Sequence, residues 1–429
     1  MQQFDNIVEA CAAPRLTTSA GKPLHSASSL PPPFPLMPND RAHTHPLAIA
    51  FALSLGAAIS LGMSRFSYAL LLPSMRADLD WSYLLAGALN TANALGYLIG
   101  ALATPALLRR YGAQTVLLAG AVLTALFLIG SGLVTDAAIL LVQRLLAGIA
   151  SALMFVTGGV LAARLGSLHP QRAGLLIGIY YGGTGLGIVL SALLVPATTL
   201  LAHASAHSWQ WAWLALGAMC LLGTAVMALP VRSIDGKAAP ASVHDRFDWR
   251  PFRFGLAGYF MYGVGYIGYM TFVVALLREQ GMSAGLITLF YSGLGLAVMA
   301  SSRIWAGLLD RSRGGRAMAL LTGLLAIATL LPALTAQPLL VFASGLLFGG
   351  VFLSVVASST ALVRHNAPMA AWSGGIGAFT SVFAFGQIVG PGVVGWIADG
   401  TGGLQRGLVF SALALLVAAL LASRQRALG

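Results

Sequence analysis

Three arginines lie inside long apolar stretches of the sequence, where charged side chains are rare. They are Arg65, Arg144 and Arg303. A buried charge is costly unless a partner compensates it. Guanidinium groups form two-pronged, charge-assisted hydrogen bonds with carboxylates. Arg65 and Arg144 are therefore candidates for binding an anion. The alternative is that each extends its side chain toward a polar surface.

Tyrosines and amides supply further polar groups in the same stretches. Tyr259, Tyr262, Tyr266 and Tyr269 recur at three- and four-residue spacing, which predicts one stripe along a helix. A tyrosine offers a hydroxyl and a ring face, so the stripe suits a ligand with polar and apolar parts, or simple helix packing. The candidate binding residues are Arg65, Tyr68, Asn90, Asn93, Arg144, Tyr262, Tyr266, Tyr269 and Gln387.

Other kinds of chemistry find little support. Cys11 and Cys220 form no CxxC pair, and no carboxylate or histidine lies well inside an apolar stretch. Glycines at 263, 265 and 268 spell GxGxxG, but inside an apolar helix and not at a strand-to-helix turn. We therefore expect no metal, no cofactor, no catalytic residues and no nucleic-acid partner.

The elements that carry these residues are long enough to cross a membrane. Of 429 residues, 58% are hydrophobic and only 8% charged, too few polar groups to cover a water-soluble globule. A hydrocarbon core of about 30 Å needs about 20 apolar residues of helix. Twelve such runs are expected, at 47–72, 83–108, 114–135, 138–164, 173–196, 209–230, 254–277, 284–309, 316–335, 338–363, 371–398 and 405–423.

The polar segments divide the chain into four parts. Residues 1–45 are polar and proline-rich, which is typical of a disordered tail, although Met37 is an alternative start and leaves open whether 1–36 are translated. A first six-helix bundle is expected at 46–230 and a second at 254–429. The longest polar interruption, 231–253, is the expected linker.

The distribution of positive charge predicts the orientation. With the amino terminus inside, 18 of the 24 basic residues lie on the cytoplasmic side and only Arg76, Arg278 and Arg406 on the other. Cytoplasmic loops of membrane proteins carry the excess of arginine and lysine. Both termini and the linker are therefore expected in the cytoplasm.

Two of the arginines are predicted to lie at a similar distance from the outer surface of the membrane. Arg65 lies eight residues before Pro73, about 12 Å from the outer end of its helix. Arg144 lies about 10 Å from the same surface on an oppositely directed helix. A charge at such depth costs at least about 2.5–3.5 kcal/mol. One anionic group bound by both residues would offset that cost.

An internal repeat relates the two halves at a separation of 201 residues. Gly62 matches Gly263, and Tyr68, Ser82 and Arg110 match Tyr269, Ser283 and Arg311 in the same way. Parallel six-helix repeats are an architecture of transporters. By the same offset, Tyr266 takes the place of Arg65.

Several segments resemble the major facilitator superfamily. RIWAGLLDRSRGG, from Arg303, is similar to the superfamily's cytoplasmic motif between helices, and PALLRRYG is its first-half counterpart with Arg109 where an aspartate is usual. RLLAG (144–148) resembles the intramembrane arginine motif. GQIVGPGVVGWIAD (386–399) resembles the eleventh helix, whose small residues permit close helix packing. GIYYGGTGLG (178–187) resembles the antiporter glycine motif, with Gly183 in place of proline.

Two further segments are similar to the YbfB-like bacterial group of this superfamily, GMSRFSYALLLPSM (62–75) and GYFMYGVGYIGYMTFVVALLRE (258–279). The resemblance covers nearly everything from about residue 47 and implies an all-α fold of twelve transmembrane helices in two pseudo-symmetric bundles. It also implies a conformational latch between the halves, for which the matching residues are Arg110, Arg303, Asp310 and Arg311. Arg303 and Asp310 are expected on one helical face. Ordinary loop charges are the alternative.

Together these observations predict a secondary transporter in the bacterial inner membrane, monomeric, with a small-molecule solute and the lipid bilayer as its only partners. The paired arginines favour an organic anion. A neutral or amphipathic solute is the main alternative. A channel or a membrane-embedded enzyme is less favoured, because neither filter loops nor clustered catalytic residues are evident.

Overall fold

A computed structural model describes residues 45–234, 247–368 and 371–428. The expected tail and most of the expected linker therefore lie outside the described residues. Twelve helices of the described chain are long and apolar enough to cross a membrane. Each corresponds to one of the twelve predicted runs, and the described residues contain no strand.

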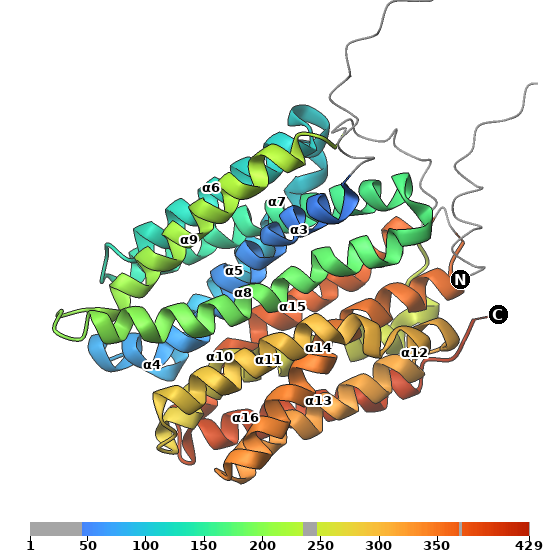
Figure 1. Cartoon of the computed structure of the whole chain (residues 1–429). Coiled ribbons are helices and arrows are strands. Elements are labelled where there is room, and N and C mark those ends of the chain that lie inside the picture. Colours follow the sequence, from blue (N-terminus) through green and yellow to red (C-terminus); the bar gives the residue numbers. More distant parts are fainter. Residues whose placement is uncertain (1–44, 235–246, 369–370, 429) are drawn as a thin grey trace, which may run out of the picture.

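The first six spans form one bundle (Figure 1). The first span is continuous from Pro46 to Leu79 but consists of three segments. The bounds are α3 Pro46–Ala57, η1 Ala58–Phe66, α4 Tyr68–Leu79, α5 Tyr83–Tyr111, α6 Ala113–Ser131, α7 Ala137–Leu168, α8 Ala173–Leu201 and α9 Ser208–Val231.

The other six spans form the second bundle, which lies beside the first (Figure 1). The bounds are α10 Arg253–Glu279, α11 Ala284–Ile304, α12 Ala306–Arg311, α13 Arg316–Leu334, α14 Pro338–Asn366, α15 Trp372–Ala398 and α16 Gly403–Ser423. Helices α3 and α10 begin, and α16 ends, at one end of the molecule, which we call the terminal end. The opposite end, where α4 ends and α5 begins, is called the far end.

Matching serine caps confirm the repeat in three dimensions. Ser82 and Ser283 each precede a helix and accept a hydrogen bond from the backbone N–H three residues later, at Leu85 and Leu286 (3.1 and 3.4 Å). Such caps satisfy one of the N–H groups that a helix start leaves unpaired. The 201-residue offset therefore relates equivalent helix starts.

Glycines let the helices that meet between the bundles approach closely. A Cβ on Gly185 of α8 would lie 2.4 Å from the carbonyl oxygen of Gly295 of α11. A Cβ on Gly87 of α5 would lie 2.4 Å from the oxygen of Pro391 of α15. Side chains at these positions would force the helices apart, so small residues are required here.

The two bundles are joined through the far half of the molecule. Seven hydrogen bonds between described residues cross from one bundle to the other. All seven lie between the level of Arg65 and the far end. The molecule is therefore closed at the far end.

The first span changes its winding at its centre. Residues 58–66 form a π-helix, in which the N–H of Ser67 bonds to the carbonyl of Gly62 (3.1 Å). Side chains of three other helices donate to carbonyls of this segment: Ser191 to Gly62 (3.4 Å), Arg144 to Ser64 (2.7 Å) and Tyr291 to Phe66 (2.7 Å). Insertions of side chains into a helix's hydrogen-bond ladder are a known cause of such distortions. Short π segments are frequent at functional sites.

The expected eighth span differs from the structure at its terminal end. The predicted single run 284–309 is interrupted at Trp305, where α11 ends and the short α12 begins. The indole N–H of Trp305 donates to the carbonyl of Gly350 on α14 (2.7 Å). Arg303 and Asp310 therefore lie on two successive helices and not on one continuous helix, and the shared face expected for them stays a prediction.

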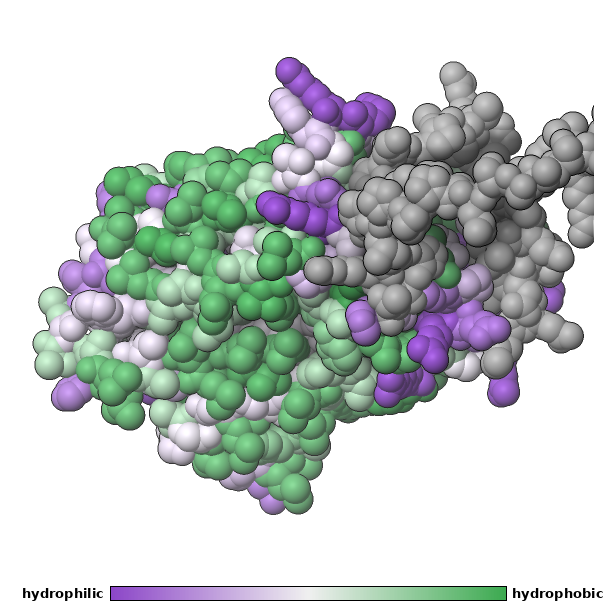
Figure 2. Space-filling model, turned by 45° about the horizontal axis from the view of Figure 1, so that its top comes forward, coloured by the Kyte–Doolittle hydropathy of each residue, from purple (hydrophilic) through white to green (hydrophobic). Residues whose placement is uncertain are grey.

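The outer surface fits a lipid environment. Figure 2 shows broad hydrophobic areas along the sides of the molecule, with hydrophilic residues gathered toward its ends. Large apolar side chains such as Leu102, Leu200, Leu339 and Trp396 are at least 67% exposed. A patch of this extent is stable only against an apolar solvent.

Candidate functional site

Arg65 lies at the centre of the interface between the bundles. It is only 3% exposed, and its Nη2 donates to the side-chain oxygen of Gln387 on α15. Its guanidinium lies 5.7 Å from the centre of the Tyr97 ring of α5. The Nε of Arg65 is buried and has no partner among the described residues. The structure thus brings together two predicted residues that are 322 positions apart in sequence.

Arg144 lies at the same level but inside the first bundle. It is fully buried, and its Nη1 donates to the carbonyl of Ser64, the residue next to Arg65. The rings of Tyr68 and Trp213 each lie 5.3 Å from its guanidinium. Its Nε and Nη2 have no partner among the described residues. The Arg144 guanidinium therefore lies beside the residue that precedes Arg65, but the two arginines contact different neighbours in this conformation.

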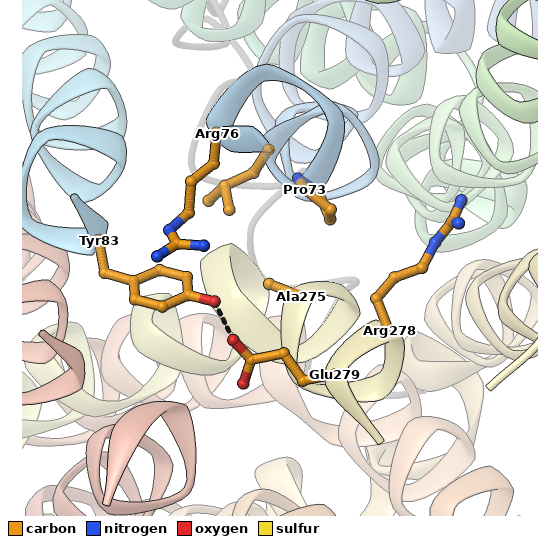
Figure 3. Close-up of a pocket in the computed structure, with 7 residues that line it drawn as sticks. Pro73, Arg76, Tyr83, Ala275, Arg278 and Glu279 are labelled. Atoms are coloured by element: carbon orange, nitrogen blue, oxygen red, sulfur yellow. Dashed lines mark hydrogen bonds between the residues drawn. The ribbon is translucent and has the colours of Figure 1, made fainter. Parts of the chain in front are cut away.

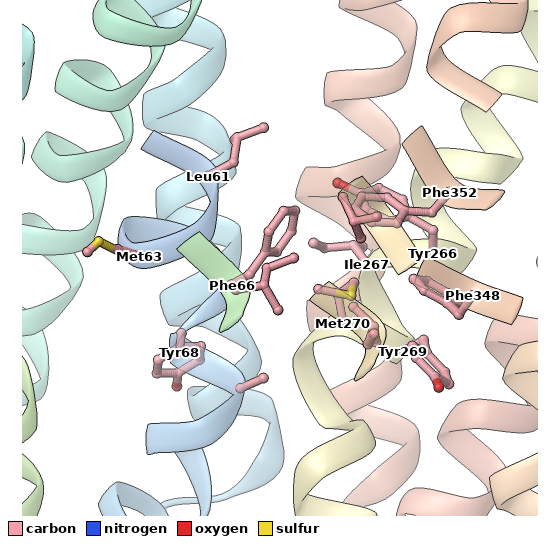
Figure 4. Close-up of a cluster of buried hydrophobic side chains, with 14 of the residues drawn as sticks. Leu61, Met63, Phe66, Tyr68, Tyr266, Ile267, Tyr269, Met270, Phe348 and Phe352 are labelled. Carbon is pink, nitrogen blue, oxygen red and sulfur yellow. The ribbon is translucent and has the colours of Figure 1, made fainter. Parts of the chain in front are cut away.

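The tyrosine stripe forms part of an aromatic array on the second bundle. The rings of Tyr262 and Tyr266 are stacked with centroids 5.0 Å apart, and both stack on Phe383 of α15 at 5.2 and 5.5 Å. Tyr266 also stacks on Phe352 of α14 (6.1 Å). Figure 4 shows Phe66 of the first bundle pointing toward Tyr266 and Phe352.

The hydroxyl groups of the stripe differ in their partners. Tyr262 donates to the carbonyl of Phe352 (2.6 Å), and Tyr269 bonds to the hydroxyl of Ser344 (2.8 Å). The hydroxyl of Tyr266 has no such bond to any described residue, and it lies within electrostatic range of Arg65. Tyr266 therefore retains a polar group for a ligand at the interface.

The remaining binding candidates form hydrogen bonds from one helix to another. Asn90 donates to the hydroxyl of Thr271 across the interface (2.6 Å), and Asn93 donates to the carbonyl of Arg144 (3.1 Å). Tyr68 donates to the carbonyl of Ala86 (2.7 Å). The side-chain oxygens of both asparagines are buried without a partner in the described chain. These three residues hold α5 against its neighbours, and the structure does not bring them to Arg65.

The latch residues lie at the terminal end. Arg110, Arg303, Asp310 and Arg311 are all exposed, and no ion pair joins any of them to another described residue. An assembled latch would close the terminal end, whereas this structure is closed at the far end. The latch residues therefore form no ion pair with one another in the described chain, and their role stays a prediction.

A second cross-bundle cluster occupies the far end. The carboxylate of Asp399, directly after α15, accepts hydrogen bonds from the first N–H groups of α5, at Tyr83 (2.6 Å) and Leu84 (2.9 Å). The Tyr83 hydroxyl donates to Glu279 of α10, and Arg76 lies 3.9 Å over the Tyr83 ring. We call these contacts the far-end clasp. A carboxylate at a helix N-terminus meets both unpaired N–H groups and the positive end of the helix dipole.

The clasp borders a small pocket between α4 and α10 (Figure 3). The pocket has a volume of about 230 Å³ and is lined by Leu72, Pro73, Arg76, Tyr83, Ala275, Arg278 and Glu279. Figure 3 shows the Arg278 side chain directed away from Glu279. Because Tyr83 and Glu279 bond to each other here, the pocket's polar groups hold the two bundles together.

Sequence reasoning missed two groups of residues. Phe383 and Phe352 lie in the aromatic array, and their only signal is that Phe383 precedes Gln387 by one helical turn. Asp399 entered the sequence analysis only as the last residue of the segment 386–399. Nothing in the sequence indicates that it caps a helix of the other half.

Comparisons with known proteins agree with this architecture. The family model described as "Uncharacterised MFS-type transporter YbfB" matches residues 57–423. No curated protein matches the sequence. Among solved structures, the nucleoside transporter NupG is 15% identical with a TM-score of 0.67, over 88% of this chain and 98% of that chain.

Two further solved structures are similar. A bacterial homologue of the human lysosomal transporter Spinster, solved inward-facing and unoccupied, is 14% identical with a TM-score of 0.66, over 88% of this chain and 96% of that chain. The human organic anion transporter MFSD10 is 17% identical with a TM-score of 0.59, over 88% and 99%. At these identities the similarity shows a shared fold.

Proposed function

The chain belongs to the family of YbfB-type transporters of the major facilitator superfamily, and from this premise we propose that it carries a small organic anion across the bacterial inner membrane by alternating access. In this proposal the terminal end faces the cytoplasm, because the basic residues gather there. Arg65 binds the anion between the two bundles, and Gln387 and Tyr266 complete the polar part of the site.

The observation that carries this proposal is a buried cation without a counter-ion. Arg65 is bound by a neutral amide, and its Nε has no hydrogen-bond partner among the described residues. The one contact of 4 Å or less between a basic and an acidic side chain that are both described, the hydrogen bond of His207 with Asp78 at 2.6 Å, lies elsewhere, at the far end. Arg144 at the same depth also lacks a carboxylate partner. Two buried cations make the centre electropositive, and an anionic solute compensates the charge that the protein leaves unpaired.

The arrangement of the two bundles supports alternating access. The contacts that close the far end include Asp399 with α5, Asn90 with Thr271 and Tyr291 with the π segment. Arg65 and Gln387 lie at the inner limit of this closed region. A solute that enters from the terminal end therefore meets Arg65 before it meets the closed far-end contacts.

The fold alone does not select the solute. The similar structures include proteins named as a nucleoside transporter and as an organic anion transporter. Because one fold supports many substrates, the argument for an anion depends on the side chains at the site. Arg65 is the residue on which it depends most.

The proposal is tested by ligand binding to the purified protein. Acetate, lactate, succinate and benzoate would be compared with their neutral amides by thermal shift and by titration. Arg65→Gln should weaken binding of an acid by about 1.5–3 kcal/mol, the range for hydrogen bonds to charged groups. That corresponds to about ten- to more than hundredfold in affinity. Arg65→Lys should restore part of it, since a point charge cannot reproduce the planar guanidinium contact.

A matched control removes an arginine from the surface. Arg406 is exposed at the far end and bonds to the Thr401 hydroxyl (2.9 Å). Arg406→Gln should leave binding unchanged. Saturable counterflow of the bound acid in proteoliposomes then shows transport. Equal binding of acids and amides, or unchanged binding in Arg65→Gln, would overturn the anion proposal and favour a neutral solute.

A further inference from the structure

Seven aromatic rings of the second bundle form one array beside Arg65. They come from three helices: Tyr259, Tyr262, Tyr266 and Tyr269 of α10, Phe348 and Phe352 of α14, and Phe383 of α15. Neighbouring rings stack with centroids 4.0–6.1 Å apart and planes within 25° of each other. Edge-to-face packing is as favourable as offset stacking. The nearly parallel orientation of neighbouring rings therefore distinguishes this array from ordinary aromatic packing.

The array is held in place without a ligand. The hydroxyl groups of Tyr262 and Tyr269 are bonded, which fixes the outer ends of their rings, and stacking on Phe383 and Phe348 orients the ring planes. Gly263 and Gly386 bring α10 against α15, since a Cβ on Gly386 would lie 2.4 Å from the carbonyl oxygen of Phe260. A rigid surface binds a flat ligand without the entropy cost of ordering the side chains.

Arg65 adjoins the array at Phe383. Gln387, which binds Arg65, follows Phe383 by four residues on α15, so the two side chains lie on the same helical face. Phe383 is only half-buried, whereas Phe348 and Phe352 are buried. Tyr266 of the same array carries the hydroxyl that has no partner among the described residues. A cation, a ring face and a hydroxyl therefore lie together at the interface.

We infer that the solute is a flat aromatic carboxylate, an inference that rests on the proposed anion transport. Its carboxylate binds the guanidinium of Arg65, taking the unpaired Nε and the Nη2 that Gln387 now occupies. Its ring lies against the half-buried Phe383, parallel to the array. The Tyr266 hydroxyl is placed to bond a polar substituent on that ring. The carboxylate of an aliphatic acid also binds Arg65, but such an acid has no aromatic ring to stack on the array.

The test uses a matched pair of acids with benzamide as the neutral probe. Benzoate and cyclohexanecarboxylate have the same charge and six-membered rings, but only benzoate is flat and aromatic. Benzoate should bind the wild type about three- to tenfold more tightly, the range for aromatic pair contacts beyond burial of area. Phe383→Leu should remove that preference, because it weakens benzoate binding more than cyclohexanecarboxylate binding.

Phe385→Leu is the matched control. Phe385 lies two residues away on the same helix, is 57% exposed, and makes no ring contact within the described chain. Its substitution should leave both affinities unchanged. Equal binding of both acids by the wild type, with loss of both in Arg65→Gln, would overturn the aromatic inference and keep the anion proposal. Binding of benzamide equal to that of benzoate would overturn both.

Discussion

Removal of the Asp399 carboxylate is expected to open the far end of the molecule. Its two oxygens accept hydrogen bonds from Tyr83 N–H and Leu84 N–H across the interface, at 2.6 and 2.9 Å. Loss of a helix-capping side chain costs about 0.5–2 kcal/mol. Two such hydrogen bonds are lost in Asp399→Ala, which raises the cost, but Asp399 is exposed and water compensates part of it, so we expect about 1–2 kcal/mol in total. A difference of that size changes a two-state ratio by about 5- to 30-fold.

Spin labels on both ends of the molecule measure this change in a cysteine-free background. One pair at Ala204 and Ala336 reports the far end, and another at Gln171 and Arg313 reports the terminal end, all four at exposed positions. In Asp399→Ala, the population with a long far-end distance should increase and that with a long terminal-end distance should decrease. Asp399→Asn keeps one acceptor oxygen and should have a smaller effect.

The control for this measurement is a cap that does not cross the interface. Asp136 accepts a hydrogen bond from the N–H of Ile139 (2.9 Å) at the start of α7, at the same end of the molecule. Asp136→Ala removes a comparable cap but leaves both bundles joined. Unchanged far-end distances in Asp399→Ala, or equal changes in both variants, would refute the reasoning that Asp399 holds the two bundles together.

Four other outcomes are expected. Asp310→Asn should shift the balance toward opening of the terminal end, which would lengthen the Gln171–Arg313 distance; an unchanged distance would leave Asp310 as a loop charge. A cysteine at position 240 should be labelled only from the cytoplasm, and labelling from outside intact cells would contradict the twelve-span orientation. Arg144→Gln should lower the thermal midpoint in the absence of ligand, because it leaves the Ser64 carbonyl without its donor; Arg65→Gln should lower it less, and the reverse order would show that Arg65 is the structural arginine. Transport of an acid whose charge is constant between pH 6 and 8 should vary little with an imposed proton gradient, because no carboxylate lies well inside a span; strong acceleration in a proteoliposome flux assay would reveal a coupled titratable group.

The sequence by itself determined the spans and the repeat, and it predicted a similar depth for the two arginines. Each of these depends on local composition: an apolar run must match the thickness of the membrane, and a residue's depth follows from the rise of its helix. The matching caps at Ser82 and Ser283 were predictable for the same reason, since a cap involves residues three positions apart. The break at Trp305 was missed because its hydrogen bond goes to another helix, at Gly350.

Only the tertiary structure decided which polar groups meet. Arg65 and Arg144 look alike in the sequence, but helix packing directs one toward Gln387 at the interface and the other toward Ser64 inside the first bundle. Asp399 becomes a helix cap only because α15 ends beside the start of α5. These contacts join residues up to 322 positions apart, and which faces of two helices meet depends on the packing of all twelve. Periodicity places a residue on a face of its own helix, but it does not identify the helix opposite.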